Sequence, residues 1–174
     1  MGKKKAQQEA QPILEDVNIE PVVGSLNVVV GKVTSGKTSL LLAMMDEMVK
    51  LQGTITKHGS ISYVPQEAFV LNATVKDNSL FGNPYDEAKY QEILTICELR
   101  PDLVVLDGGD MTEIGERGIN MSGGQKQRIS LARAVYADSD IYLIDDALSA
   151  LDAFVGKKIF DNVFANKLKT KTVI

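Results

Sequence analysis

Residues 31–38 of this chain have the sequence GKVTSGKT, which matches the spacing G-x-x-x-x-G-K-[ST] of a phosphate-binding loop. The apolar, β-branched residues 26–30 precede this loop and predict a buried strand, and the strong helix formers at 39–48 predict a helix after it. A loop between a strand and a helix turns backbone N–H groups toward an anion, next to the positive end of the helix dipole. The alternative, a glycine-containing turn that matches by chance, is less consistent with this context.

Each residue type in the loop suits a triphosphate. Gly31 and Gly36 permit backbone angles that a Cβ would forbid. Lys37 supplies a point charge for the outer phosphates, and the hydroxyl of Thr38 is a suitable ligand for Mg²⁺.

Composition narrows the class of protein. A length of 174 residues fits one domain, and the net charge of −4 argues against nucleic acid or an anionic membrane as a general electrostatic partner. The lone Cys97 fits a reducing compartment and is expected to be a buried apolar residue. The sequence shows no apolar run of transmembrane length, and residues 1–11 are expected to form a disordered polar tail.

Strands and helices are expected to alternate along the chain. Strands are predicted at residues 13–19, 53–56, 60–64, 141–144 and 172–174, and helices at 86–99, 122–137 and 151–164, with a loop at 107–121. This order predicts an α/β fold with a parallel sheet of βαβ units.

Two aspartates follow the predicted strand at 141–144. A carboxylate at the end of such a strand holds Mg²⁺ in phosphate-loop NTPases, which makes Asp145 the candidate ligand. Asp146 is placed to orient or deprotonate an attacking water. The alternative is that both aspartates merely cap the next element.

A second anion-binding segment is predicted at residues 122–125, with the sequence SGGQ. A serine cap and two glycines at a helix start allow backbone N–H groups to approach a phosphate closely. Because one nucleotide rarely needs two such cradles, this segment is expected to serve a nucleotide held by another molecule. The alternative is an ordinary glycine-containing helix start.

Five motifs together resemble the nucleotide-binding domain of an ATP-binding cassette (ABC) transporter. They are the phosphate loop, YVPQ at 63–66, SGGQ at 122–125, Asp145-Asp146, and SALD at 149–152, in that order. Residues 112–118 and 131–136 resemble the exporter branch, and residues 145–153 resemble the first nucleotide-binding domain of multidrug resistance-associated transporters, the C subfamily. The resemblance runs from about residue 13 to 174. It implies a P-loop NTPase fold with a central, mostly parallel sheet, a helical subdomain at about 67–137, and a domain incomplete at both ends.

The resemblance also implies roles for individual residues. ATP and Mg²⁺ are the expected cofactors, and the catalytic residues would be Asp146, Gln66 and Lys37. The nucleotide would be bound by Gly31, Thr34, Ser35, Gly36, Lys37, Thr38 and Ser39, and the metal by Thr38, Gln66 and Asp145. The signature residues Ser122, Gly123, Gly124 and Gln125 would close on ATP bound to a second nucleotide-binding domain, and Asp152 would lie at that dimer interface. Transmembrane coupling helices would contact Gln66 and its neighbours, which places the domain at the cytosolic face of a membrane.

The sequence departs from the family pattern at four points, and two of them, Asp146 and the missing switch histidine, favour weak hydrolysis. Asp146 stands where strong ATPase sites carry glutamate, and Thr34 stands where a third loop glycine is usual. No aromatic residue precedes Tyr63 to stack on adenine, and the switch histidine of the family would lie beyond Ile174. The alternatives are a nucleotide-binding structural or regulatory half without turnover, a truncated non-functional fragment, and a soluble cassette ATPase acting on DNA or ribosomes. The last is disfavoured, because the interval of 85 positions from Lys37 to Ser122 (122 − 37 = 85) contains no sustained heptads.

Overall fold

The computed structural model describes residues 12–115 and 121–174. The chain forms two compact units, which are described separately. The first, the loop unit, comprises Met1–Glu20 and Val30–Lys57, and the second, the sheet unit, comprises Pro21–Val29 and His58–Ile174. The expected tail at 1–11 and residues 116–120 of the expected loop lie outside the described residues.

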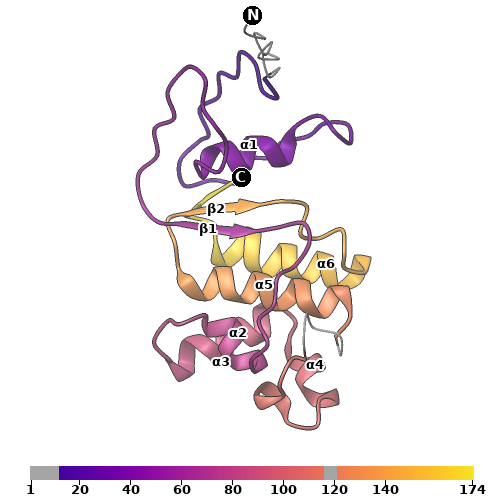
Figure 1. Cartoon of the computed structure of the whole chain (residues 1–174). Coiled ribbons are helices and arrows are strands. Elements are labelled where there is room, and N and C mark those ends of the chain that lie inside the picture. Colours follow the sequence, from indigo (N-terminus) through magenta and orange to yellow (C-terminus); the bar gives the residue numbers. More distant parts are fainter. Residues whose placement is uncertain (1–11, 116–120) are drawn as a thin grey trace, which may run out of the picture. The chain divides into compact units, whose positions relative to one another are not determined.

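A three-stranded parallel sheet forms the centre of the sheet unit (Figure 1). Its strands are β1 (Ile61–Val64), β2 (Ile141–Ile144) and β3 (Thr172–Val173), in the order β1-β2-β3. Ile61 pairs with Ile141, which in turn pairs with Thr172. The α/β class and the parallel sheet predicted from the sequence are therefore confirmed.

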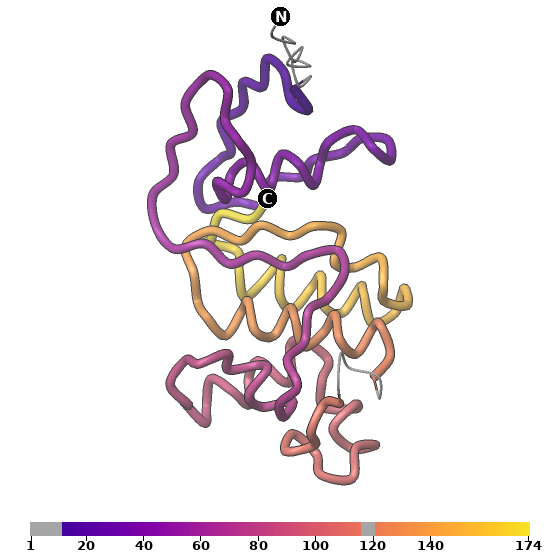
Figure 2. The backbone as a smooth tube through the Cα atoms, in the orientation of Figure 1, coloured from indigo at the N-terminus to yellow at the C-terminus, as the bar shows by residue number. Residues whose placement is uncertain are grey.

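Two helical segments cover one face of this sheet (Figures 1 and 2). One is α5 (Gly123–Ala137), and the other is α6 (Ala153–Ile159), which continues as the π-helical segment η3 (Phe160–Lys167). Alternate residues of β1 face the core, where Val64 is completely buried. Ser62 on the same face accepts or donates a 2.8 Å hydrogen bond with Ser139, so its buried hydroxyl is satisfied.

Further helices pack on the other side of α5 (Figure 1). They are α2 (Val75–Leu80), α3 (Glu87–Ile96), α4 (Arg100–Val105) and the short 3₁₀ helix η1 (Gly109–Met111). Asp86 caps α3 by accepting from the backbone N–H of Lys89 at 2.8 Å. Pro101 lies in the first turn of α4, where its missing N–H costs no hydrogen bond.

Helix α2 was not predicted, because its six residues carry no clear apolar stripe. Thr74 caps it, and the buried amide of Asn78 fixes the preceding segment by accepting from Leu71 N–H at 2.7 Å and donating to Leu71 C=O at 3.0 Å. Side-chain hydrogen bonds stabilise this short helix together with burial at helical spacing, but two of its buried positions, Asn78 and Ser79, are polar and give no apolar pattern in the sequence.

Helix α1 (Lys37–Met44) is the one regular element among the described residues of the loop unit. The prediction that it continues to residue 48 is wrong. The chain leaves the helix at Met45, and Asp46 adopts a left-handed conformation with φ 63°. The carboxylate of Asp46 there forms a 2.6 Å ion pair with Lys57, which favours the turn over further helix.

Three predicted strands are also wrong. Residues 13–19 and 53–56 form no strand, because neither finds a partner among the described residues. Of residues 26–30, only Leu26 forms a bridge, which is parallel to Val173, and Val28 is 72% exposed. Because the neighbouring strand β3 is only two residues long, the predicted buried strand does not extend beyond this bridge.

Candidate functional site

The phosphate-binding loop lies in the loop unit and leads directly into α1. Gly36 occupies the N-cap position in a left-handed conformation (φ 89°), and no side chain caps the helix. By contrast, α2, α3, α5 and α6 each begin with a side chain that accepts from a helix N–H. The first N–H groups of α1 therefore have no capping side chain within the described residues, which is the arrangement that suits an anion.

Lys37 closes this loop on itself. Its ammonium group donates to the carbonyl oxygens of Gly31 at 3.0 Å and Lys32 at 2.9 Å. A Cβ on Gly31 would lie 2.6 Å from the hydroxyl of Ser35, so only glycine fits this position without a shift. An ammonium has three donors, and two such contacts leave one for a ligand.

Thr34 is the unusual residue of the loop. Its φ of 67° lies in the left-handed region, where a β-branched side chain is strained. Glycine would adopt this conformation at no steric cost. Thr34 is exposed, and its hydroxyl donates to the carbonyl oxygen of the preceding Val33 at 2.5 Å, an exposed contact that offsets little of the strain.

Asp145 follows β2 in the sheet unit and is 6% exposed. Its backbone N–H donates to Val64 C=O at 2.9 Å, which extends the β1–β2 ladder by one residue. Tyr63 lies on the neighbouring strand, and its pKa is raised first by burial and then by the charge and hydrogen bonding of Asp145. The structure thus places a buried carboxylate at the carboxyl end of a parallel strand, where ligands of α/β sheets bind.

Asp146 and Gln66 lie together in the structure. The side-chain amide of Gln66 donates to the Asp146 carboxylate at 3.3 Å. Buried Gln127 fixes the residue before Gln66 by donating to Pro65 C=O at 3.1 Å. Asp146 itself is exposed with φ 49°, a conformation that aspartate adopts more readily than most residues.

The predicted metal ligands provide only oxygen donors, as Mg²⁺ requires. The buried Asp145 carboxylate and the exposed Gln66 side chain belong to the sheet unit, and Thr38, in the first turn of α1, belongs to the loop unit. No group of three or more His, Cys, Asp or Glu side chains that could hold a metal occurs in the described part of the chain. Mg²⁺ is usually bound by one or two carboxylates together with substrate phosphates, so the donor set fits this ion without a protein cage.

The signature segment forms the first turn of α5 and is closed by a capping box. Ser122 Oγ accepts from the N–H of Gln125 at 3.2 Å, and Gln125 Oε1 accepts from the N–H of Ser122 at 2.9 Å. Among the described residues beyond its own helix, a Cβ on Gly123 would meet nothing within 4 Å, whereas one on Gly124 would lie 3.3 Å from Ala150 C=O. Within the described part of the chain Gly123 therefore faces open space, and Gly124 packs tightly.

Asp152 caps α6. Its carboxylate accepts from the N–H groups of Phe154 at 3.1 Å and Val155 at 3.0 Å. This contact accounts for an aspartate here within one chain, and it leaves the predicted place of Asp152 at a dimer interface untested.

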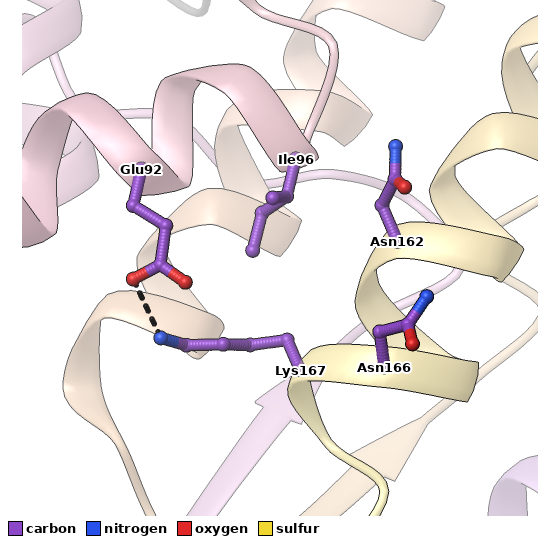
Figure 3. Close-up of a pocket in the computed structure, with 5 residues that line it drawn as sticks. All are labelled: Glu92, Ile96, Asn162, Asn166 and Lys167. Carbon is purple, nitrogen blue, oxygen red and sulfur yellow. Dashed lines mark hydrogen bonds and ion pairs between the residues drawn. The ribbon is translucent and has the colours of Figure 1, made fainter.

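A surface cavity of about 370 Å³ lies between α3 and η3 (Figure 3). It is lined by Glu92, Ile96, Asn162, Asn166 and Lys167. Glu92 and Lys167 form an ion pair of 2.7 Å across it. None of the predicted site residues lines this cavity, so it is separate from the residues described above.

Comparison with known families decides what these motifs belong to. The model of the family described as "ABC transporter" matches residues 14–149, which is most of the chain. The chain belongs to the ABC transporter family. This match confirms the ABC resemblance and the P-loop NTPase class, and it implies ATP binding, generally with Mg²⁺.

Individual relatives of this ABC domain are C-family members, as expected. The chain is 55% identical over 161 residues to ABC transporter C family member 3 of Dictyostelium discoideum, covering 92% of this chain and 11% of the relative. It is 57% identical over 155 residues to ATP-binding cassette sub-family C member 2 of Rattus norvegicus (89% and 10%), and 52% identical over 168 residues to the Homo sapiens protein of that name (95% and 11%). The chain spans about a tenth of the length of these relatives. No helix in the described part of the ABC domain is long and apolar enough to cross a membrane.

The sequence did not identify one feature of this ABC domain, an aromatic patch organised by Arg133. The guanidinium of Arg133 lies 4.4 Å from the ring centre of Phe81 and 5.5 Å from that of Phe69, and both rings are about half exposed. Arg133 also donates to the backbone and side-chain oxygens of Asn78, at 2.9 and 3.0 Å. In the sequence, Phe69 and Phe81 are isolated residues with no periodic pattern. Nothing in their spacing indicates that either ring contacts Arg133.

Proposed function

We propose that this ABC domain binds ATP with Mg²⁺ at residues 31–38 and forms one half of a clamp that closes with a second nucleotide-binding domain. The observation that carries the proposal is the start of α1, where Gly36 replaces a capping side chain and leaves helix N–H groups to an anion. A helix start without a capping side chain leaves N–H groups that a bound phosphate can satisfy.

Different groups of the loop are proposed to bind different parts of the nucleotide. The N–H groups of the loop and of the first helical turn, at Gly31, Thr34, Ser35, Gly36 and Ser39, would donate to phosphate oxygens. Lys37 would turn its ammonium from the loop carbonyls toward the outer phosphates. Mg²⁺, when bound, neutralises phosphate charge, and Thr38, Asp145 and Gln66 are the residues that would hold it.

The signature residues would act on the nucleotide of the second domain. Gly123 faces open space, and Ser122 keeps its hydroxyl hydrogen as a donor while its oxygen caps α5. Asp152 is proposed to lie near this interface. Closure of the two domains around ATP would then drive transport through transmembrane segments.

The aromatic patch of Phe69, Phe81 and Arg133 is the surface proposed for contact with those transmembrane segments, together with Gln66. The proposal is supported by two half-exposed phenylalanine rings that both lie against Arg133, because apolar surface gathered at one place can mark an interaction site. The domain would accordingly lie at the cytosolic face of a membrane, and nucleic acid is not a proposed partner.

ATP binding is tested by alanine substitution of two lysines in the loop, one as the test and the other as its control. Lys37→Ala should weaken MgATP binding by about 10- to 100-fold in calorimetry, because a hydrogen bond from a charged group contributes about 1.5–3 kcal/mol. Lys32→Ala is the matched control, since Lys32 contributes its carbonyl rather than its ammonium to the loop. Equal affinities for the wild type and Lys37→Ala would refute the proposal.

A second candidate is a nucleotide-binding half without its own turnover, and Asp146 favours it. Aspartate is one methylene shorter than glutamate, which retracts the carboxylate by about 1 Å, and a displacement of that size can cost about 10²-fold in rate. One carboxylate oxygen of Asp146 also accepts a hydrogen bond from the side-chain amide of Gln66.

The two candidates are separated by single-turnover hydrolysis in a heterodimer with a second nucleotide-binding domain whose own site is blocked. Asp146→Glu should raise the rate at this chain's loop by about 10²-fold if carboxylate reach limits hydrolysis. Asp146→Asn is the control for charge. No gain with glutamate would contradict the role of Asp146 and favour a half without turnover.

A further inference from the structure

A buried polar network joins α4 to the first turn of α5. Its centre is Asp102 on α4, which is 8% exposed. The Asp102 carboxylate accepts from Arg128 through Nε at 2.8 Å and Nη2 at 2.7 Å, a two-pronged ion pair. It also accepts from Gln125 Nε2 at 3.3 Å.

Both polar atoms of the Gln125 side-chain amide form hydrogen bonds. While Nε2 donates to Asp102, Oε1 accepts from the N–H of Ser122 at 2.9 Å. Gln125 therefore connects the backbone of the signature segment to a buried carboxylate on another helix. This was not expected from the sequence, which assigned Gln125 to the nucleotide of the opposing domain.

Arg128 brings the same network beside the signature glycines. Its Nη1 lies 3.6 Å from the position that a Cβ on Gly124 would take. Asp102 thus fixes the first turn of α5 at two points, through Gln125 at Ser122 and through Arg128 beside Gly124.

We propose that Asp102 is a positioning residue for the signature segment. Without touching nucleotide, it holds Gln125 and Arg128 so that Ser122 and Gly123 keep the orientation in which they close on ATP. This inference rests on the proposed function, in which the segment completes a site on a second nucleotide-binding domain. A simple packing role for the Asp102–Arg128 pair would stabilise α4 against α5 but would not depend on the donor at Gln125.

The test exchanges donor and acceptor between the two positions. Gln125→Glu can still accept from Ser122 N–H, but it loses the donor to Asp102 and faces a carboxylate. Asp102→Asn loses a charge but gains an amide that can donate. When the two substitutions are combined, the new amide at position 102 can donate to the new carboxylate at position 125, which restores this link in the reverse direction, while the remaining oxygen of that amide keeps one of the two acceptors for Arg128.

Two readouts separate positioning from packing. The first is the release rate of labelled ATP from a hydrolysis-blocked second domain clamped against this chain. Each single variant should release ATP about tenfold faster, and the double variant should return to within about threefold of the wild type, since contacting residues couple by this order. The second readout, on this chain alone, is amide exchange at Ser122, which should accelerate about tenfold in each single variant and recover in the double.

A control variant and the behaviour of the wild type distinguish failure of this inference from failure of the proposed function. Asp161→Asn breaks an exposed ion pair with Lys157 and should change neither readout. If the wild type fails to trap ATP with the second domain, the proposed function fails and this inference with it. If the wild type traps ATP but the single variants match it, or if the double variant is no better than the singles, Asp102 is a packing residue only. Gln125→Met, which keeps the side-chain length but neither bond, replaces Asp102→Asn if that variant does not fold; it should release ATP at least as fast as Gln125→Glu and should accelerate amide exchange at Ser122 further, because it also loses the acceptor for Ser122 N–H.

Discussion

Gly123 and Gly124 are adjacent in sequence, but they should respond oppositely to the same change. Alanine at Gly123 adds a methyl group that meets no heavy atom within 4 Å of the Cβ position among the described residues, apart from its chain neighbours and the backbone of its own helix. Alanine at Gly124 puts the methyl group 3.3 Å from the carbonyl oxygen of Ala150, which is backbone and can yield only by moving the segment after β2.

The expected free energies follow from these distances. Replacing glycine by alanine in a compatible conformation stabilises a protein by about 0.4–1 kcal/mol, through the unfolded state. Neither glycine has positive φ, so both should receive this gain. At Gly124, overpacking costs about 1–3 kcal/mol. We therefore expect Gly123→Ala to raise the free energy of unfolding by about 0.5 kcal/mol and Gly124→Ala to lower it by about 1 kcal/mol.

Urea unfolding of the two variants and the wild type measures these changes. A second assay, ATP trapping with a partner domain, should show that Gly123→Ala loses trapping although it is the more stable variant, because its methyl group occupies the face proposed to meet phosphate. If Gly123→Ala trapped ATP as well as the wild type, Gly123 would not approach the partner's nucleotide. If both variants were equally stable, the packing argument at Ala150 would be wrong.

Three other changes test individual contacts. Thr34→Gly should raise the free energy of unfolding by about 0.5–1 kcal/mol in denaturant titrations, because relief of about 1–2 kcal/mol of left-handed strain outweighs the greater unfolded-state freedom of glycine; a destabilised variant would contradict the strain. Arg133→Ala should cost about 3 kcal/mol by the same measurement, since it removes two hydrogen bonds to Asn78 and the ring contacts, and Arg133→Lys should recover only part of this. Hydrogen bonds from the backbone and hydroxyl of Ser60 lower the pKa of Asp140. The contribution of Asp140 to stability is therefore present above the unfolded pKa of about 3.8 and is lost as the pH falls through the lower folded pKa. Asp140→Asn should reduce the loss of unfolding free energy at acid pH, and an unchanged pH dependence would refute this.

Local sequence spacing predicted the elements that local forces determine. The loop at 31–38, the start of α5 at Ser122 and strands β1 and β2 were found because glycine spacing, a serine cap and apolar runs specify them without distant partners. The strand at 26–30 failed because a strand needs a partner, and only Leu26 has one in β3.

The hydrogen bonds around Asp102 could not be predicted from the sequence, because they also depend on a partner that is distant in the chain. Asp102 and Gln125 are 23 residues apart, and nothing in their spacing indicates that they touch. One signal was available, because Ser122 followed three residues later by Gln125 is a capping-box pattern. That pattern predicts the bond between Gln125 and Ser122, but not the bond of the same amide to α4.

The starts of α1 and α5 differ in a way that predicts how each responds to nucleotide. Helix α1 begins at Gly36 without a capping side chain, whereas α5 is closed by Ser122 and Gln125. An anion at α1 would supply acceptors that no capping side chain in the described part of the chain provides, so MgATP should slow amide exchange in residues 37–39 of the chain alone. It should leave the first turn of α5 unchanged, because that turn is already capped and would meet nucleotide only on a second domain. Adding the second domain with MgATP should then protect both segments, and protection of α5 by MgATP alone would refute this division between the two helix starts.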